Sequence, residues 1–388
     1  MGRLIFVYFI SFFLLGELVS CSISNKKAVT IYVDGKDSLF ICDYKQIRKH
    51  EERKLSEYVD DFKIIFFENK DICFFRYWKV YVTDNYIGIL QSLESPFKLF
   101  DHNGNFICDV GTIGKGPGEY LKLYSAIIDE YKECIYLAPF FGNNILKYNL
   151  DGTFQHEIYV GSMQKAQMAL KEDGDLVITH LALNGLSKFQ YAQVDKNLNV
   201  SYVSPSNSFM SSIDLKGNFV GFNHDIWFFN NTTDFTYMTT ALDTLYLFDE
   251  KKKMTLPRFT MINHTNYCIY NECPSFFLIE ELVKDSNMGN ISKTIISEKE
   301  NQETYYLDLK NDFLGDLPVS FNCRNVSDGW YHEMFEPYEL LDKIDDFLES
   351  KDCTAEAKKL LKQLESKIDE NGNNILFIAK LKDLHPIQ

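Results

Sequence analysis

The sequence has little of what marks several classes of protein. Only 20 glycines and 9 prolines occur among 388 residues, which excludes collagen-like and low-complexity chains. Basic residues number 40 against 55 acidic ones, for a net charge of −15. This balance argues against nucleic acid as a partner, because binding phosphates requires a basic face. No Cys-x-x-Cys pair occurs, so a zinc ribbon is not expected.

Apolar and aromatic residues, in contrast, are abundant. They make up 45% and 15% of the chain, with 32 Phe and 23 Tyr. Disordered chains are poor in such residues. The chain is therefore expected to bury a large core.

The first 20 residues predict a lipoprotein signal peptide. Arg3 supplies a positive charge, and Leu4–Leu15 is apolar apart from Ser11, a run too short to span a bilayer. The order Leu-Val-Ser and then Cys21 resembles the bacterial lipobox, whose cysteine becomes acylated. We expect cleavage before Cys21, anchoring to a lipid membrane through the acyl chains on this residue, and a polar tether over residues 21–27. The alternative is an ordinary secretory signal that a cysteine follows by chance.

The same region indicates which membrane holds the anchor. The six residues after Cys21 contain no acid, whereas an acidic run there would resemble the surface-export signal of Bacteroidetes lipoproteins. We therefore expect a position in the cell envelope, on the outer membrane and facing the periplasm. No later stretch reaches the roughly 18 apolar residues that a spanning helix needs.

The eight remaining cysteines are widely spaced. Cys73 and Cys108 lie in apolar, strand-like runs, so buried thiols are the expectation for most of the set. Disulfides are permitted outside the cytoplasm, and Cys268 and Cys273 are the best candidates for one.

A repeat of strand, tight turn and strand runs through the chain. It is clearest at Phe97–Val110 and Ile145–Ile158, which contain Asn-Gly and Asp-Gly, the strongest short-range hairpin signals. Degenerate copies occur at Tyr191–Val203 and Leu245–Leu256. The polar residues that open the four turns are spaced 48, 46 and 54 residues apart: Asp101, Asn149, Asp195 and Asp249.

Each hairpin is preceded by a further strand pair, which gives about four strands per repeat. Four strands in 40–50 residues are the signature of a β-propeller blade. The spacing predicts an all-β, six-bladed β-propeller over residues 28–388, with the blades themselves at 28–320. A terminal strand usually closes such a ring, and Val29–Val33 or Ile375–Leu381 could do so.

Two segments depart from the strand pattern. Residues Gln46–Tyr58 are charged and predict a short helix or an exposed loop. Residues Ala355–Ile368 predict a short C-terminal helix, with Thr354 as its cap and leucines on one face. The acidic stretch Asp342–Glu349 is interpreted as a solvated face, with attraction of cations or of a basic partner as the alternative.

A glycine-rich segment, GTIGKGPGEY, follows the first hairpin. It resembles the hallmark of the six-bladed β-propeller lipoproteins of Bacteroidetes, whose relatives are the NHL-type propellers. Its matching positions are Gly111, Gly114, Gly116, Pro117, Gly118, Glu119 and Tyr120, with Lys115 between them. Asn325–Tyr338 resembles the segment before the family's final strands, and Asn373–Lys382 its closing strand, although Ile375 replaces the proline of the usual Asn-Pro pair. The resemblance supports architecture more than activity.

The glycine segment does not predict a nucleotide site. A P-loop needs Gly-Lys-Ser/Thr, but Pro117 follows Gly116, and the segment does not open a helix. We expect a crossover between blades in which at least one of Gly114, Gly116 and Gly118 has a positive φ. The functional alternative is a binding loop, with Lys115, Glu119 and Tyr120 at one mouth of the channel.

Motifs for catalysis are lacking. The histidines are scattered, and no Gly-x-Ser-x-Gly elbow occurs, so we assign neither catalytic nor metal-binding residues. NHL-type relatives include lactonases with Ca²⁺ on the inner strands. The acids and amides available for such a Ca²⁺ site here are Glu119, Asn143, Asn144, Asn223 and Asp225.

The sequence therefore favours a non-catalytic binding or scaffold module for a protein, peptide or glycan. A Ca²⁺-dependent propeller hydrolase or lactonase is the alternative. Aromatic side chains expected in the loops suit carbohydrate stacking or protein contact: Tyr120, Tyr124, Phe140, Phe141, Trp330 and Tyr331.

Overall fold

The computed structural model describes seven stretches of the chain: residues 27–34, 37–91, 94–171, 173–182, 187–203, 224–285 and 289–382. The predicted signal peptide and Cys21 lie outside these residues. Within them, no helix is of a length and hydrophobicity that would let it cross a membrane.

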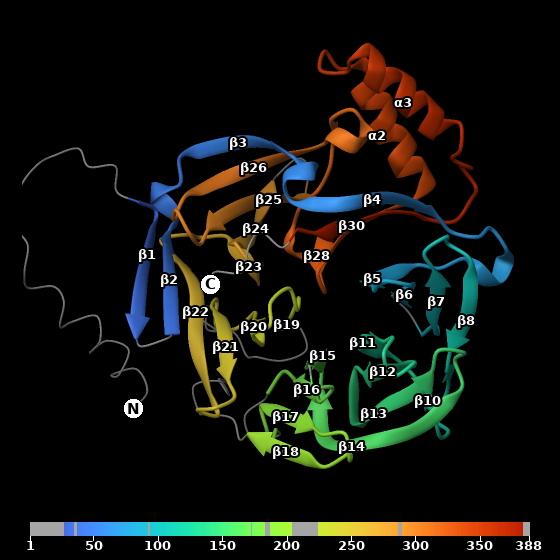
Figure 1. Cartoon of the computed structure of the whole chain (residues 1–388), viewed down its shortest axis with the longest axis vertical. Helices are drawn as coiled ribbons and strands as arrows, with labels where there is room; N and C mark the ends of the chain where they lie inside the picture. The colour runs from blue at the N-terminus through green and yellow to red at the C-terminus, as the bar shows by residue number, and fades with distance from the viewer. Residues whose placement is uncertain are drawn as a thin grey trace, which may run out of the picture.

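Six β-sheets are arranged in a ring around a central axis, which is the predicted six-bladed propeller (Figure 1). Blades 1 to 3 each have four antiparallel strands in chain order. Blade 1 contains β5 (Tyr77–Val82), β6 (Tyr86–Gln91), β7 (Phe97–Asp101) and β8 (Phe106–Val110). Blade 2 contains β11 (Leu123–Asp129), β12 (Cys134–Pro139), β13 (Phe141–Asn149) and β14 (Phe154–Gln164). Blade 3 contains β15 (Gln167–Leu170), β16 (Leu176–Thr179), β17 (Tyr191–Val194) and β18 (Val200–Val203).

Blades 4 to 6 recruit strands from the N-terminal part of the chain. Blade 4 contains β19 (Ile226–Trp227), β20 (Thr236–Thr239), β21 (Leu245–Asp249) and β22 (Met254–Ile262), extended by β2 (Asp37–Asp43) and β1 (Val29–Asp34). Blade 5 contains β23 (Tyr267–Glu272), β24 (Phe276–Asp285), β25 (Gly289–Glu298) and β26 (Thr304–Asn311), extended by β27 (Leu317–Pro318) and β3 (Lys49–Lys54). Blade 6 contains β28 (Val326–Ser327), β29 (Trp330–Phe335), β30 (Ile375–Leu381) and β4 (Val59–Phe66).

The four predicted hairpins are confirmed as the pairs β7–β8, β13–β14, β17–β18 and β21–β22 of blades 1 to 4. Their turns show why the same residue types recur. The Asp101 carboxylate accepts hydrogen bonds from the backbone N–H groups of Asn103 and Asn105, at 2.8 and 2.9 Å. Gly104 follows with φ of 80°. Side-chain capping of a turn and a left-handed glycine are both local requirements, so they leave a mark in the sequence.

The ring closes in blade 6, where β30 lies between β29 and β4. The candidate closing strand Ile375–Leu381 is thus confirmed, whereas Val29–Val33 does not close the ring. Its strand, β1, pairs with β2, which runs parallel to β22 on the rim of blade 4. Blade 6 lies largely beyond residue 320, so the blades do not fit into 28–320 as the spacing suggested. Part of residues 28–320 forms β1, β2 and β3 instead, and these strands extend blades 4 and 5.

The prediction of a helix or loop over Gln46–Tyr58 is wrong. This segment contains β3, which pairs in parallel with β26 on the rim of blade 5. Single-turn 3-10 helices flank it at Tyr44–Gln46 and Leu55–Glu57. Charged side chains are well tolerated on an edge strand, where they face solvent, so high charge did not exclude a strand here.

Two helices, α2 (Pro337–Glu349) and α3 (Ala355–Glu365), project beyond the ring (Figure 1). Helix α3 is the predicted one and ends three residues earlier than expected. The Thr354 hydroxyl caps it by accepting a hydrogen bond from the Ala357 N–H at 3.1 Å. Helix α2 was not predicted. It contains the acidic stretch on its outer face, while Leu340, Ile344 and Phe347 are buried against blade 6 and α3.

The eight cysteines of the described residues are free thiols, and six of them are buried. The candidate disulfide between Cys268 and Cys273 is not formed, because the two side chains belong to different core clusters. Burial raises the pKa of Cys273 to about 12, so this thiol is protonated at neutral pH. The cysteines therefore act as small hydrophobic residues, as most of the sequence evidence indicated.

Candidate functional site in the central cavity

A cavity of about 830 Å³ lies at the centre of the ring. It is lined mainly by the innermost strands of blades 1, 2, 3, 4 and 6, which are β5, β11, β15, β19 and β28. The chain has three tryptophans, and all of them line this cavity: Trp78, Trp227 and Trp330. They come from three different blades, so only the closed ring brings them together.

Hydrogen bonds between blades show that the inner strands begin at the same end of the cavity. The Lys79 ammonium donates to the Tyr124 carbonyl at 2.9 Å. The Tyr124 hydroxyl donates to Asp225 Oδ1 at 3.1 Å, and the Gln167 amide donates to the Ile226 carbonyl at 3.0 Å. These contacts join the first residues of β5, β11, β15 and β19. We call this the basic end, defined by Lys79, which lines the cavity, and by Lys122 and Lys165, whose ammonium groups lie near the ring of Phe140 beside it.

The opposite end of the cavity, where the inner strands finish, is acidic. Asp84 and Glu130 follow β5 and β11, and Asp328 follows β28. Lys380 forms an ion pair with Asp84 at 2.8 Å. We call this the acidic end, defined by Asp84, Glu130 and Asp328. The cavity therefore has a polarity along its axis.

Aromatic rings and ammonium groups alternate at the basic end. The rings of Trp78 and Tyr124 meet edge to face, with centroids 5.4 Å apart, and Phe140 continues the row at 5.5 Å from Tyr124. Lys79 Nζ lies 4.2 Å from the Tyr124 centroid and 4.7 Å from that of Trp78. Lys122 Nζ lies 4.7 Å from the Phe140 centroid. Cation–π attraction holds these ammonium groups in place.

Burial lowers the pKa of Lys79 to about 7, and the nearby Lys165 ammonium acts in the same direction. Asp225 opposes this shift, but its carboxylate is 2.8 Å from Lys165 Nζ and forms an ion pair there. Within the described residues, neither Lys79 nor Lys122 has a carboxylate oxygen within 4.0 Å. The basic end thus has more positive than negative charge.

Acidic and aromatic groups also meet at the acidic end. Because protein surrounds it, the pKa of Asp328 is raised to about 6, although the side chain faces the open cavity. Asn230 Nδ2 donates to Asp328 Oδ1 at 2.9 Å, which opposes this shift. Trp330 also lines the cavity, although its side chain is only 9% exposed, and Lys380 Nζ lies 5.5 Å from the ring centroid. The carboxylate and amide groups at this end can bind hydroxyl groups of a ligand.

The predicted calcium ligands are not gathered at one place. Asp225 lines the cavity, while Glu119 accepts a hydrogen bond from Gly116 and Asn144 donates one to Glu157. Asn223 lies outside the described residues. Across the described stretches, no three His, Cys, Asp or Glu side chains are grouped so that they could hold a metal ion.

The glycine segment forms the connection from β8 in blade 1 to β11 in blade 2, at the rim (Figure 1). It contains a small parallel pair, β9 (Thr112–Ile113) and β10 (Glu119–Tyr120). The buried Tyr120 hydroxyl donates to the Val110 carbonyl at 2.5 Å and accepts from the Phe97 N–H at 2.9 Å. Tyr120 therefore fixes the segment to the core between two blades.

The expected positive φ is confirmed at Gly118, which has φ of 70°, as does Gly111. Gly114 and Gly116 do not adopt such a conformation. The Glu119 carboxylate accepts a hydrogen bond from the Gly116 N–H at 2.7 Å, so it stabilises the loop.

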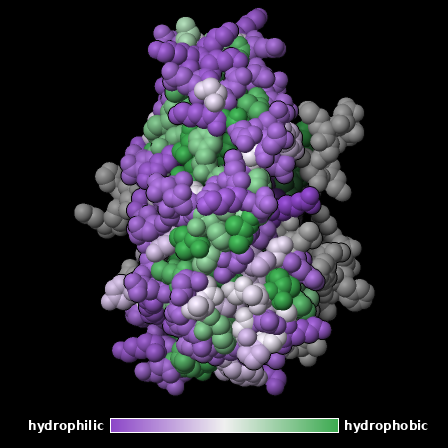
Figure 2. All heavy atoms as spheres, turned by 90° about the vertical axis from the view of Figure 1, so that its right-hand side faces the viewer, coloured by the Kyte–Doolittle hydropathy of each residue, from purple (hydrophilic) through white to green (hydrophobic). Residues whose placement is uncertain are grey.

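No residue of 111–120 lines the central cavity. Binding by this loop, including Lys115 and Pro117, stays a prediction. The neighbouring rim is mainly hydrophilic, with small separate hydrophobic patches (Figure 2).

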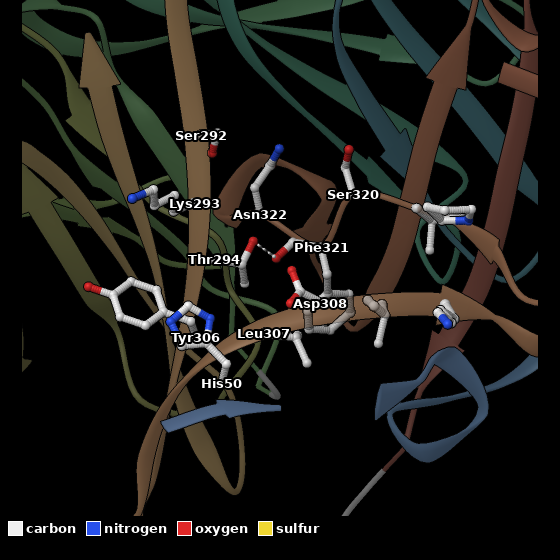
Figure 3. A pocket seen from close by; sticks show the side chains of 14 residues that line it. His50, Ser292, Lys293, Thr294, Tyr306, Leu307, Asp308, Ser320, Phe321 and Asn322 are labelled. Carbon is white, nitrogen blue, oxygen red and sulfur yellow. Dashed lines mark hydrogen bonds between the residues drawn. The ribbon is translucent and has the colours of Figure 1, made fainter. Parts of the chain in front are cut away.

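A second, smaller pocket of about 520 Å³ lies on the outer part of blade 5 (Figure 3). Here β25 pairs with β26 only from Ile295 to Ser297, and the two strands then separate. His50 stacks on Tyr306 at a centroid distance of 4.8 Å, and the Thr294 hydroxyl donates to the Phe321 carbonyl at 3.0 Å. This pocket contains none of the tryptophans and is the weaker candidate.

Of the six aromatic residues expected to contact a ligand, Tyr124 and Trp330 line the cavity, although their side chains are only 2% and 9% exposed. Phe140 supports the basic end, Phe141 is 60% exposed, and Tyr120 and Tyr331 are buried. Sequence reasoning missed Trp78, Trp227 and Lys79. Two signals were available in the sequence. Tryptophan is rare in this chain, and all three tryptophans occur in or directly beside strand-like runs.

A model of the family described as a domain of unknown function, DUF4934, matches residues 39–380, and the chain belongs to this family. A candidate exported protein of Bacteroides fragilis has a similar structure, with a TM-score of 0.59 and 18% identity over 88% of this chain and 100% of that one. At this identity the likeness shows the fold alone.

Two further structures are more distant. A DUF4221 family member from Bacteroides vulgatus gives a TM-score of 0.47 at 10% identity, covering 84% of this chain and 97% of that one. The extracellular domain of a candidate one-component system from B. thetaiotaomicron gives 0.36 at 12%, covering 68% and 36%. No curated protein matches.

Proposed function

We propose that this protein is a non-catalytic binding propeller of the cell envelope that holds an oligosaccharide in its central cavity. The observation that carries the proposal is the convergence of all three tryptophans on one cavity. Indole rings offer flat apolar faces on which the C–H faces of sugar rings can stack, and polar groups beside them fix the orientation of hydroxyls.

The size and shape of the site favour a small ligand over a protein. A volume of about 830 Å³ lies in the range of roughly 300–1,000 Å³ that is usual for small-ligand pockets. A protein partner would need roughly 800 Å² of surface on each side, which a cavity enclosed by inner strands does not offer. Trp78 is 38% exposed and Tyr77 40%, so part of the aromatic surface is open to a ligand.

A test of this function measures oligosaccharide binding to the mature chain by calorimetry. The probes are cellohexaose, mannohexaose and hexagalacturonate. We expect Trp78→Ala to weaken the affinity by about tenfold, since a stacked ring contributes roughly 1–2 kcal/mol. Tyr131→Ala is the matched control, because this ring is 96% exposed and lies outside the cavity. Absence of saccharide binding by the folded protein at millimolar concentration would rule the function out.

The proposed envelope location depends on the leader and Cys21. The lipobox supports acylation of Cys21, and the absence of acids in the six residues after it supports attachment to the outer membrane on the periplasmic side. Several acyl chains on one residue would hold the protein stably at the membrane. The likeness to NHL-type propellers is retained as part of this proposal.

We expect Cys21→Ala to release the protein from the membrane fraction, because the acceptor of the acyl chains is lost. Immunoblots of membrane and periplasmic fractions measure this, with Ser22→Ala as the control that keeps the lipobox cysteine. Globomycin, which inhibits the lipoprotein signal peptidase, should make the uncleaved precursor accumulate. Membrane retention of the alanine variant would argue against the lipobox and for another anchor.

A further inference from the structure

We propose that the basic end of the cavity binds an anionic sugar residue, so that the ligand is an acidic oligosaccharide bearing carboxylate or sulfate groups. This inference depends on the proposed function, because it specifies the ligand of the same cavity. Three features support it: the charge balance of the basic end, the bonding of Lys79, and the polarity of the cavity.

The charge balance differs from that of the whole protein. The chain has a net charge of −15, yet the Lys79 ammonium lines this end, and those of Lys122 and Lys165 lie beside the same row of aromatic rings. Asp225 is the carboxylate that faces them, and it forms an ion pair with Lys165. An acidic protein repels anions over most of its surface, so ammonium groups beside aromatic rings are a local exception that suits an anionic ligand.

Lys79 has capacity for a further partner. An ammonium group has three donor hydrogens. In the described part of the chain, Lys79 Nζ donates one hydrogen bond, to the Tyr124 carbonyl, and otherwise faces the rings of Trp78 and Tyr124. Removing an ammonium from water without an anion is costly, which is why the pKa of Lys79 is lowered to about 7. A carboxylate or sulfate beside Lys79 would offset this desolvation cost and favour the charged ammonium form.

The neighbouring indole explains why the anion belongs to a sugar. Trp78 precedes Lys79 in β5, and its ring also lies 6.0 Å from Lys122 Nζ. A sugar ring stacked on Trp78 would place an acidic substituent within reach of both lysines. The acidic end, with Asp84, Glu130 and Asp328, repels the same group, so the ligand has one preferred direction in the cavity.

The experiment compares ligands that differ only in charge. Hexagalacturonate and its fully methyl-esterified form are titrated into the mature protein by calorimetry, together with a sulfated hexasaccharide of heparin and a hexaglutamate peptide. We expect one or both acidic saccharides to bind at least about tenfold more tightly than the methyl ester. The two acidic saccharides distinguish carboxylate from sulfate recognition.

Lysine variants locate the effect. Lys79→Met and Lys122→Met should each lower the affinity for the acidic saccharide by about tenfold and leave the methyl ester unchanged. Lys122 is exposed, so its variant folds even if Lys79→Met does not. Lys196→Met, in the outer turn of blade 3, is the control and should bind like wild type.

The pH dependence is a second readout. Lys79 faces Tyr124 of β11, Asp225 before β19, and Lys165 between β14 and β15. Its ammonium form predominates below pH 7 and is lost above it. Affinity for the acidic saccharide should therefore be highest below pH 7 and fall above it, at most tenfold per pH unit. Lys79→Met should remove this decrease, and the methyl ester should not show it.

Each outcome is decisive. Equal affinity for hexagalacturonate and its methyl ester, with no gain from sulfate, would overturn the inference and leave the proposed function intact. Absence of binding by every saccharide would overturn both. Tighter binding of hexaglutamate than of any saccharide would overturn both in favour of an acidic peptide.

Discussion

Replacing Gly118 with valine should lower the free energy of unfolding by about 3–5 kcal/mol. Gly118 has φ of 70°, a conformation that costs an L-residue roughly 1–2 kcal/mol and a β-branched one more. A Cβ at this position would also lie 2.4 Å from Cγ of Phe154, and overpacking typically adds about 1–3 kcal/mol. Urea denaturation followed by tryptophan fluorescence measures the change.

Gly116→Ala is the matched control in the same loop. Gly116 has no left-handed backbone, and a Cβ there would first meet the Glu119 carboxylate, the mobile end of a side chain, at 3.0 Å. We expect this variant to lose at most about 1 kcal/mol. If Gly118→Val were as stable as Gly116→Ala, the segment would have no structural requirement for glycine, and its binding role would become the better explanation.

The hairpins could be predicted because their chemistry is local. Asp101 binds backbone groups two and four residues away, and Gly104 supplies the left-handed residue of the same turn. Turns of this kind favour such residues at this spacing, although in blade 3 Leu198 takes the left-handed position with φ of 62°. Repetition of such turns then gave the number of strands per blade and the class of fold.

Helix α2 was missed although its signals are also local. Glu336 and Glu339 form a capping box, Pro337 occupies the first turn, and Leu340, Ile344 and Phe347 follow at helical spacing. Sequence reasoning gave more weight to the acidic residues of the same stretch and interpreted them as surface. A surface helix carries both patterns at once, one on each face.

Closure of the ring and the tryptophan cavity could not be read from local patterns. Strand β4 pairs with β30 although Ile65 and Leu376 are more than 300 residues apart. Trp78, Trp227 and Trp330 lie in different blades, and the Lys79 ammonium in blade 1 interacts electrostatically with Asp225 at the start of blade 4. Such neighbours result from the geometry of the whole ring, and only the low number of tryptophans hinted that they share a role.

The place where the ring closes, beside β4 and β30, should be equally sensitive to substitution. Asn373 is buried directly before β30, and its side-chain amide donates to the carbonyls of Glu68 and Cys73 at 3.2 and 2.9 Å. The side-chain oxygen of Asn373, Oδ1, accepts a hydrogen bond from the Asn374 N–H at 2.9 Å. Asn374 in turn donates to the Phe75 carbonyl at 3.1 Å. The two asparagines thus fasten the connection between β4 and β5 to the closing strand.

We expect Asn373→Leu to lower the free energy of unfolding by about 3–5 kcal/mol, because leucine of similar volume leaves buried carbonyl groups without donors, at roughly 1–3 kcal/mol each. Asn373→Asp should be at least as harmful, since a carboxylate also cannot donate. Asn371→Leu is the control, because Asn371 is exposed two residues earlier in the same turn. Thermal and urea unfolding of the three variants measure the differences.

Equal stability of Asn373→Leu and Asn371→Leu would mean that strand pairing between β4 and β30 closes the ring without the asparagines. A selective loss in Asn373→Leu would show that hydrogen bonds spanning some 300 residues hold the ring closed.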